Sequence, residues 1–529
     1  MHVKIPRTRK RISLGSATIL LVGSSLVAQI LGFMRTKLVN ANFPAVGPHS
    51  TDSYFAAFSI PDFFFFTISA GALGVAFMPV LADHLARHDR KGMWRLTSSL
   101  LNFMSLLMLG VAVVIFLFAQ PLVHHLVPKL GPQQLHDAVV IMRLLCLNPL
   151  LFTISGILTA TQQTMGRFFF YAIAPLFYNA AIIASIYIFK NNIGLIGLGV
   201  GAMVGAVLQL LVVIVGTYGT GFRWYPHIQW NLADFRLVLR QLPPRSLDQG
   251  IDQLESIVET RFASGIGPGN VSYYNNAYTL MTAPVLLIGT AISTAIFPRL
   301  NNRLSHGRPD LFRQDFLRIL RLIIWITLPV IVICFFGRGY LARLIFSRNS
   351  VDIANIFGFL TVAIFFRTVY TIMSRWFYAQ KDTRTPLYVS VFTIIFNIIL
   401  AYNLTKPGGY GVAGLALAQS IVAAVEVIIL SVIMLVRDPK LFDREFWSGI
   451  FRTISVTGFS LVAGYITVGF VPLSIGDRGF ITLGVKLAII AGVTMLTHFA
   501  ISGLFDLEEA RPFWRWVKRV LYRPVKVEY

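Results

Sequence analysis

Continuous apolar segments, each long enough to cross a lipid bilayer, recur along almost the whole 529-residue chain. A helix needs about 20 predominantly apolar residues to span the hydrocarbon, and about fourteen segments meet that requirement. The runs do not alternate between apolar and polar residues, which excludes an outer-membrane β-barrel. Because backbone polar groups in lipid must pair internally, the pattern predicts an all-α polytopic membrane protein. The predicted spans are 13–34, 54–82, 95–119, 137–162, 166–189, 193–218, 245–265, 273–300, 313–336, 351–379, 386–404, 409–436, 450–471 and 480–504.

The distribution of charge orients these spans. The chain is 55% hydrophobic and 13% charged, with a net charge of +23, which by itself would suggest a nucleic-acid partner. The basic residues, however, cluster before the first span, after the second and in alternate loops thereafter. This distribution follows the positive-inside rule, so it predicts two cytoplasmic termini, an even number of spans and no nucleic-acid partner. One loop departs from the rule, because it carries Arg338, Arg343 and Arg348 on the side that is otherwise poor in charge.

The chain repeats itself internally. Residues 71–81 resemble residues 290–300, with Pro79 matching Pro298, and residues 177–179 resemble residues 395–397 at nearly the same separation. Two matches in the same order predict two parallel copies of a six-helix unit, followed by two further spans. The expected organisation is a basic cytoplasmic N-terminus 1–12, an N-lobe 13–218, a cytoplasmic linker 219–244, a C-lobe 245–436, two C-terminal spans within 437–505 and a basic amphipathic tail 506–529.

An acidic stripe marks the seventh predicted span. Ionisable side chains are costly in a bilayer, so each is a hypothesis about function. Four carboxylates at i, i+4, i+7 and i+11 lie on one helix face: Asp248, Asp252, Glu255 and Glu259. Four interpretations remain open: the wall of a water-filled cavity neutralised by Arg245 and Arg261, ion pairs with basic residues of another helix, a cation site, or a site of proton exchange.

Catalytic motifs are absent from the sequence. It contains no metal-spaced His/Cys cluster, no glycine loop for phosphate followed by Lys-Ser/Thr, and no nucleophile elbow. We therefore expect a transporter that is not an enzyme and has no metal or organic cofactor. Its energy would come from Na⁺, H⁺ or the membrane potential.

The first two spans resemble a known family. The similarity lies in residues 31–35 (Leu-Gly-Phe-Met-Arg), 50–62 (ending in Ile-Pro-Asp) and 76–79 (Ala-Phe-Met-Pro). These stretches are similar to the MurJ (MviN) lipid II flippases of the multidrug/oligosaccharidyl-lipid/polysaccharide exporter superfamily, and the two extra C-terminal spans are typical of that family. The resemblance implies a V-shaped cavity between two six-helix lobes that works by alternating access. Its cargo would be undecaprenyl-pyrophosphate-linked disaccharide-peptide, moved from the inner to the outer leaflet of the bacterial cytoplasmic membrane.

The resemblance also implies site residues. Arg35 matches an important arginine of the family, and Asp52 matches its acid at the start of the second span. Lys37 and Arg261 are further candidates for the pyrophosphate, to which arginine offers bidentate bonds. Some members bind a cation between the seventh and eleventh spans, where Asp252 and Asn397 lie. The implied partners are lipid II, membrane lipids and other proteins of cell-wall synthesis.

The sequence departs from the family pattern in the second span. Phe65 and Phe66 stand where the family often has a basic pair, and Ala70 stands where it has a glutamate. These departures keep two alternatives open: a flippase for another polyprenyl-linked saccharide, or a cation-coupled drug exporter. A membrane enzyme acting on a polyprenyl phosphate would need an acidic metal-binding motif at the mouth of a loop, which the sequence lacks. A scaffold for cell-wall machinery would not need charges that face a cavity. Loss of function on neutralising the buried charges would separate a transporter from a scaffold.

Overall fold

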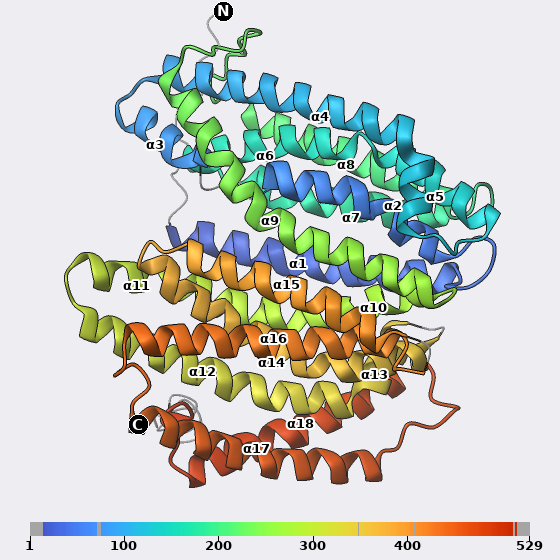
Figure 1. Ribbon diagram of the computed structural model, residues 1–529, viewed down its shortest axis with the longest axis vertical. Coiled ribbons are helices and arrows are strands. Elements are labelled where there is room, and N and C mark those ends of the chain that lie inside the picture. Colours follow the sequence, from blue (N-terminus) through green and yellow to red (C-terminus); the bar gives the residue numbers. More distant parts are fainter. Residues whose placement is uncertain (1–13, 71–75, 347–348, 407, 512–513, 516–529) are drawn as a thin grey trace, which may run out of the picture. The chain divides into compact units, whose positions relative to one another are not determined.

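The computed structural model describes residues 14–70, 76–346, 349–406, 408–511 and 514–515, except for the side chains of residues 14–22, 69–70, 243–249 and 251–252. The chain divides into two compact units, Met1–Thr260 and Arg261–Tyr529. Within the described residues, every regular element is a helix (Figure 1). The prediction of an all-α fold is therefore confirmed.

The first unit is a bundle whose helices pack closely through small residues. At Gly205 on α8, an added Cβ would lie 2.9 Å from the carbonyl oxygen of Tyr178 on α7, so only glycine allows this approach. The elements of this unit are α1 (Leu14–Asn42), α2 (Thr51–Phe65), the π-helical segment η1 (Phe66–Ala70), α3 (Met78–Ala86), α4 (Arg90–Leu126), α5 (Pro132–Leu145), α6 (Asn148–Thr164), α7 (Phe169–Phe189), α8 (Ile196–Thr217) and most of α9 (Ala233–Ile266).

The second unit is organised around α14, which packs against α10, α12 and α16. Its core includes the fully buried side chains of Phe316, Ile323 and Phe377. The elements are α10 (Asn270–Pro284), the π-helical segment η3 (Val285–Thr290), α11 (Ala291–Ser305), α12 (Pro309–Phe336), α13 (Arg338–Ile345), α14 (Ser350–Ala379), α15 (Arg384–Leu404), α16 (Val412–Arg437), α17 (Arg444–Phe470) and α18 (Phe480–Leu504).

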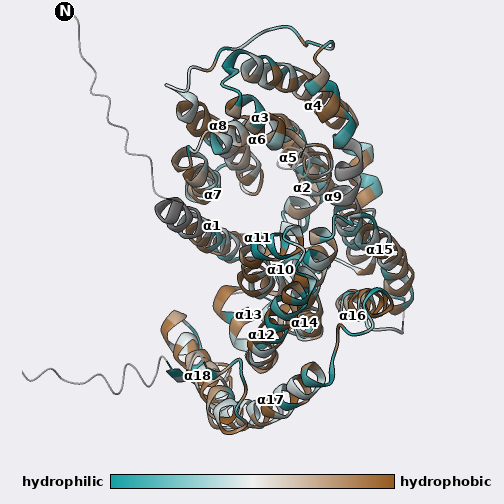
Figure 2. Cartoon of the chain, turned by 90° about the vertical axis from the view of Figure 1, so that its left-hand side faces the viewer, coloured by the Kyte–Doolittle hydropathy of each residue, from teal (hydrophilic) through white to brown (hydrophobic). Residues whose placement is uncertain are grey.

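The helices have the length and surface of membrane spans. Eleven helices or helix pairs in the described residues are long and apolar enough to cross a bilayer. Each predicted span coincides with a helix or a run of helices, although the total of fourteen spans stays a prediction. Many large apolar side chains are exposed, including those of Phe470 (83% exposed) and Leu504 (79% exposed). Much of α17 and α18 has the brown colour of hydrophobic residues in Figure 2. Such surfaces suit lipid rather than water as the surrounding solvent.

The sequence repeat reappears as a structural repeat. The π-helical segments begin at Phe66 and Val285, which have the same separation in the chain as Pro79 and Pro298. In each copy the π-helical segment precedes a helix that contains the proline. In the second copy, an added Cβ on Gly289 would lie 2.8 Å from Thr371 Oγ1, so this segment lies tightly against α14. Wide helical turns of this kind are frequent at functional sites, and here they occur at equivalent places of both copies.

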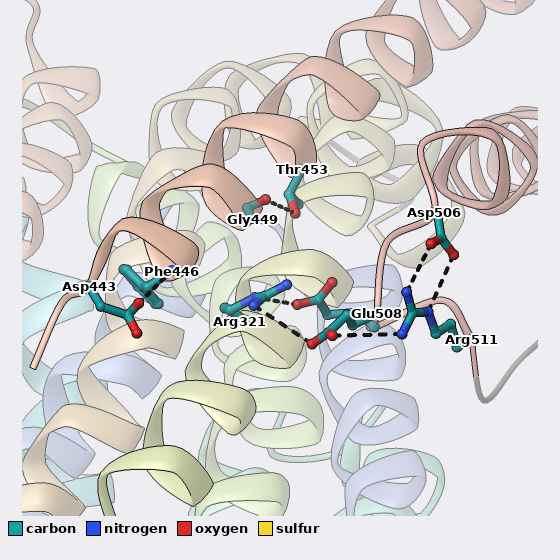
Figure 3. A network of polar contacts seen from close by, with 9 residues as sticks. Arg321, Asp443, Phe446, Gly449, Thr453, Asp506, Glu508 and Arg511 are labelled. Atoms are coloured by element: carbon teal, nitrogen blue, oxygen red, sulfur yellow. Dashed lines mark hydrogen bonds and ion pairs between the residues drawn. The ribbon is translucent and has the colours of Figure 1, made fainter.

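A polar clamp attaches the last two helices to the second unit (Figure 3). Arg321 on α12 pairs with Glu509 at 2.5 Å and lies 3.9 Å from Glu508, both just beyond α18. On α17, an added Cβ at Gly449 would lie 2.7 Å from the Arg321 guanidinium, so the arginine occupies space that only glycine leaves. The clamp thus fixes α17 and the end of α18 to α12.

Candidate functional site

Three helices of the first unit bring a charge pair and two phenols together. Arg35 on α1 interacts electrostatically with Asp62 on α2 and with two hydroxyls, those of Tyr54 on α2 and Tyr178 on α7. Tyr54 and Asp62 are eight residues apart on one helix, which puts them two turns apart on nearly the same face. Arg35 and Asp62 are both half-buried. The cluster therefore combines a guanidinium, a carboxyl and two hydroxyls that can donate to or accept from a polar ligand.

An aromatic row leads to this cluster from α2. The ring of Phe65 lies 5.4 Å from that of Phe152 on α6, and Phe152 lies 5.2 Å from Tyr178 on α7. Residues 63–66, at the junction of α2 and η1, are all phenylalanine, so the region is apolar and aromatic. Positive charge in this part of the unit comes instead from α1, through Arg35 and the half-buried Lys37.

Asp52 lies inside a polar junction between the start of α2 and α5. Its residue is 1% exposed and sits in the first turn of α2, where the helix dipole favours a negative charge. Its neighbour Ser53 donates to the Gln134 carbonyl at 2.9 Å, and His49 Nδ1 lies 2.6 Å from Asp137 Oδ2. This environment suits a residue that fixes the start of α2, and a role of Asp52 in substrate binding stays a prediction.

The structure describes part of the acidic stripe. Glu255 and Glu259 lie one turn apart on α9 and are each 6% exposed, whereas Asp248 and Asp252 belong to the residues whose side chains are not described. No group of three or more His, Cys, Asp or Glu side chains within the described residues could hold a metal ion.

Two further candidates belong to the second unit. Arg261 is exposed on α9, and Asn397 is 1% exposed on α15. A coupling site that joins Asn397 to the acidic stripe therefore stays a prediction.

A buried polar network crosses the second unit. Arg367 on α14 lies 3.3 Å from Glu426 and 3.0 Å from Gln419, both on α16. Ser390 on α15 donates to the other oxygen of Glu426 at 2.9 Å, and the Tyr370 hydroxyl lies 3.3 Å from that serine. The Arg367 side chain thus has a carboxylate partner within the same unit. The sequence analysis missed Glu426, although an acid alone in the apolar span 409–436 was a usable signal.

Comparison with known proteins identifies the family. The family model described as "Lipid II flippase MurJ" matches residues 47–477. The chain belongs to the MurJ lipid II flippase family. Two relatives named "Probable lipid II flippase MurJ" illustrate the match. That of Buchnera aphidicola subsp. Acyrthosiphon pisum is 26% identical over 431 residues, covering 80% of this chain and 82% of its own. The relative from Borreliella burgdorferi is 24% identical over 510 residues, which cover 95% of this chain and 98% of the relative.

Solved structures place the fold in the same group. The structure titled "Lipid II flippase MurJ, inward closed conformation" superposes with a TM-score of 0.75 at 20% identity, over 92% of this chain and 98% of that one. The structure of an inward-facing MATE-family multidrug transporter of the MOP superfamily superposes with a TM-score of 0.67 at 15% identity. That match covers 80% of this chain and 98% of the transporter. The fold is therefore that of MurJ and its MOP relatives, as the resemblance implied. The matched MurJ range contains Asp62, Glu255 and Glu426 but begins after Arg35.

Proposed function

We propose that this chain moves lipid II, the undecaprenyl-pyrophosphate-linked disaccharide-peptide, from the inner to the outer leaflet of the bacterial cytoplasmic membrane by alternating access. The observation that carries the proposal is the MurJ family match, which extends over most of the chain. The Borreliella burgdorferi relative that bears this name is matched across 98% of its length. A duplicated helical architecture with ionisable groups inside it also fits a transporter that rocks two halves about a central site.

The Arg35 cluster supplies the chemistry for the lipid-linked diphosphate. A guanidinium presents a planar fork of N–H donors that matches two phosphate oxygens at once. Asp62 orients Arg35 by charge, and Tyr54 and Tyr178 offer hydroxyls beside it. Lys37 and Arg261 are proposed to add positive charge for the same headgroup, and Asp52 to keep the start of α2 in place. In this proposal the chain carries out binding and reorientation, with no covalent step.

The orientation and the energy source are part of the proposal. The positive-inside distribution supports two cytoplasmic termini. The buried Glu255 and Glu259 support coupling to Na⁺, H⁺ or the membrane potential through the acidic stripe, because ionisable side chains are costly in a membrane and mark candidate functional sites. Other proteins of cell-wall synthesis are proposed partners that would take the delivered precursor.

Complementation tests the function directly. A bacterium is depleted of its own lipid II flippase while it expresses this chain, and labelled lipid II on the outer leaflet is measured. Restored labelling is the expected result, and it would show that Phe65 and Phe66 can replace a basic pair. If inserted, stable protein leaves lipid II inside, the proposal fails. The replaced basic pair would then favour another polyprenyl-linked saccharide as the cargo.

A further inference from the structure

The short helix α13 carries the basic residues that break the charge pattern of the loops. Arg338 and Arg343 lie on α13, between α12 and α14, and Arg348 lies outside the described residues. The proposed orientation puts this segment at the outer face of the membrane, where loops of this chain are otherwise poor in lysine and arginine. A basic segment on that side is unfavourable for insertion, so it needs a reason of its own.

Both arginines line a cavity that is otherwise mostly apolar. Its volume is about 480 Å³, and it is enclosed by α13, the end of α12, the start of α14 and the end of α17. Tyr465, Val468 and Leu473 form its wall on the α17 side. The Tyr340 hydroxyl donates to the carbonyl of Val471, which holds α13 against the end of α17. The cavity is thus a built feature of the second unit.

The two guanidiniums are held in place without neutralisation. Arg338 donates to the Phe335 carbonyl at 2.7 Å and stacks over that ring at 4.7 Å, while Arg343 donates to the Ser474 carbonyl at 2.6 Å. Within the described residues, neither forms an ion pair. The nearby carboxylate of Asp477 is held by Lys486 at 2.6 Å. Asp352, exposed in the first turn of α14, forms no ion pair with either arginine.

Several arginines at the opposite end of the same unit are neutralised by carboxylates. Arg313 pairs with Asp438 at 2.8 Å, Arg437 with Asp382 at 2.6 Å and Arg511 with Asp506 at 2.8 Å. Positive charge that is fixed, unneutralised and beside an apolar wall is the combination that recognises an anionic amphiphile. Phosphate is the anion best matched to arginine forks.

We infer that this cavity binds the phosphate of an anionic phospholipid from the outer leaflet, with the acyl chains along the exposed apolar end of α17. A volume of about 480 Å³ is in the range that holds a molecule of drug size, such as a glycerophosphate headgroup. The large disaccharide-peptide of the transported lipid does not fit within it. The assignment to the outer leaflet rests on the orientation given under the proposed function.

The test measures lipid binding to the purified full-length protein. The protein is exchanged into detergent, mixed with phosphatidylglycerol or phosphatidylethanolamine, and the bound lipids are counted by native mass spectrometry. We expect phosphatidylglycerol to bind preferentially, and the double variant Arg338→Gln/Arg343→Gln to lose roughly tenfold in affinity for each charge-assisted bond removed. Arg384→Gln, an exposed arginine at the opposite face, is the matched control and should bind like the parent protein.

A second variant keeps the test valid if the double variant is unstable. Asn355 is an exposed lining residue on α14, so Asn355→Glu adds a carboxylate beside the cavity while it leaves both arginine contacts intact. It should also weaken phosphatidylglycerol binding. Equal binding of the two lipids, or unchanged binding in both variants, would overturn the inference. Stronger retention of undecaprenyl diphosphate than of phosphatidylglycerol would also overturn it and assign the cavity to the transported lipid.

Failure of this inference can be told apart from failure of the proposed function. The purified protein can bind phospholipid without transporting lipid II. The binding measurement therefore tests this inference independently of the proposed function. The leaflet is checked with Ile475→Cys, because Ile475 is 92% exposed beside the Ser474 carbonyl that Arg343 contacts. A membrane-impermeant maleimide should label this cysteine from outside intact spheroplasts. Labelling only after lysis would overturn the outer-leaflet assignment.

Discussion

The guanidinium of Arg367 on α14 lies 3.3 Å from the carboxylate of Glu426 on α16, where the two side chains are 22% and 3% exposed. Gln419 binds the same arginine and Ser390 binds the same carboxylate, so the pair joins three helices of the second unit. A buried pair with its remaining bonding groups satisfied is far less costly than a single buried charge. The pair therefore fixes how these helices meet.

Removing one partner of this pair should destabilise the protein strongly. Glu426→Ala removes the carboxylate from the half-buried Arg367, and we expect the free energy of unfolding to fall by about 3 kcal/mol. Unfolding of the detergent-solubilised protein, followed by intrinsic fluorescence, gives this value. Glu445→Ala, at an exposed acid on α17, should leave it almost unchanged. If the double variant Arg367→Met/Glu426→Leu is as unstable as Glu426→Ala, the pair is not the cause.

Gly449 makes room for the arginine of the α12 clamp. An alanine there would put a methyl group about 2.7 Å from the guanidinium of Arg321, whose side chain is 12% exposed and paired with Glu509. We expect Gly449→Ala to destabilise the protein by about 1–3 kcal/mol, the usual cost of overpacking. Gly458→Ala is the matched control on α17, because an added Cβ there meets nothing within 4 Å. Equal melting temperatures of the two variants would contradict this account of the clamp.

Features that depend on local sequence could be predicted. The spans follow from apolar runs, and the repeat follows from similar segments that contain Pro79 and Pro298. The separation of these prolines also marks the two π-helical segments at Phe66 and Val285, but the π-helical geometry itself could not be predicted. It depends on packing such as that of Gly289 against Thr371, which only the folded unit reveals.

Features that depend on tertiary contacts escaped prediction. Arg367 lies within the apolar span 351–379, but its partner Glu426 lies two helices later in the chain and no spacing rule links them. The burial of Asp52 against α5 likewise requires α2 and α5 to meet. Arg35 was identified through its family motif, whereas its electrostatic contact with Tyr178 depends on the packing of α1 against α7.

Asp382 should make stability depend on acid pH. Partial burial raises the pKa of this carboxyl, but hydrogen bonds from Thr385 and Arg437 lower it more, from 3.8 to about 2. A carboxyl with a lowered pKa stabilises the fold above its ordinary pKa, and that contribution disappears as the pH falls through about 2. Because solvent screens this partly exposed site, the parent protein should exceed Asp382→Asn in unfolding free energy by only about 1 kcal/mol at pH 6, and the difference should disappear between pH 4 and pH 2. A gap that is constant over this range would contradict the prediction.

Variants of the acidic stripe should reveal which ion or potential drives transport. If Asp252 and Glu255 couple transport to a cation or proton, their amide variants should lose the dependence of lipid II movement on Na⁺ or on the membrane potential. The physical reason is that an amide of the same shape has no negative charge to attract a cation and no proton to release at neutral pH. Transport by Asp252→Asn and Glu255→Gln is compared across Na⁺ gradients and with the potential collapsed. An unchanged dependence in both variants would leave these residues as the wall of a cavity.

Arg35 should be indispensable for transport while contributing little to insertion. Arg35→Ala removes two charge-assisted bonds to the diphosphate, each worth about 1.5 kcal/mol, so lipid II movement should fall roughly a hundredfold. Arg35→Lys keeps the charge without the planar fork and should recover only part of the rate. The measurement is outer-leaflet lipid II in depleted cells, with membrane insertion checked by immunoblotting. Lys190→Ala, an exposed lysine at the end of α7, serves as the control for loss of a single positive charge. Normal growth of cells that depend on Arg35→Ala would remove this arginine from the substrate site and leave its contact with Asp62 as a structural pair.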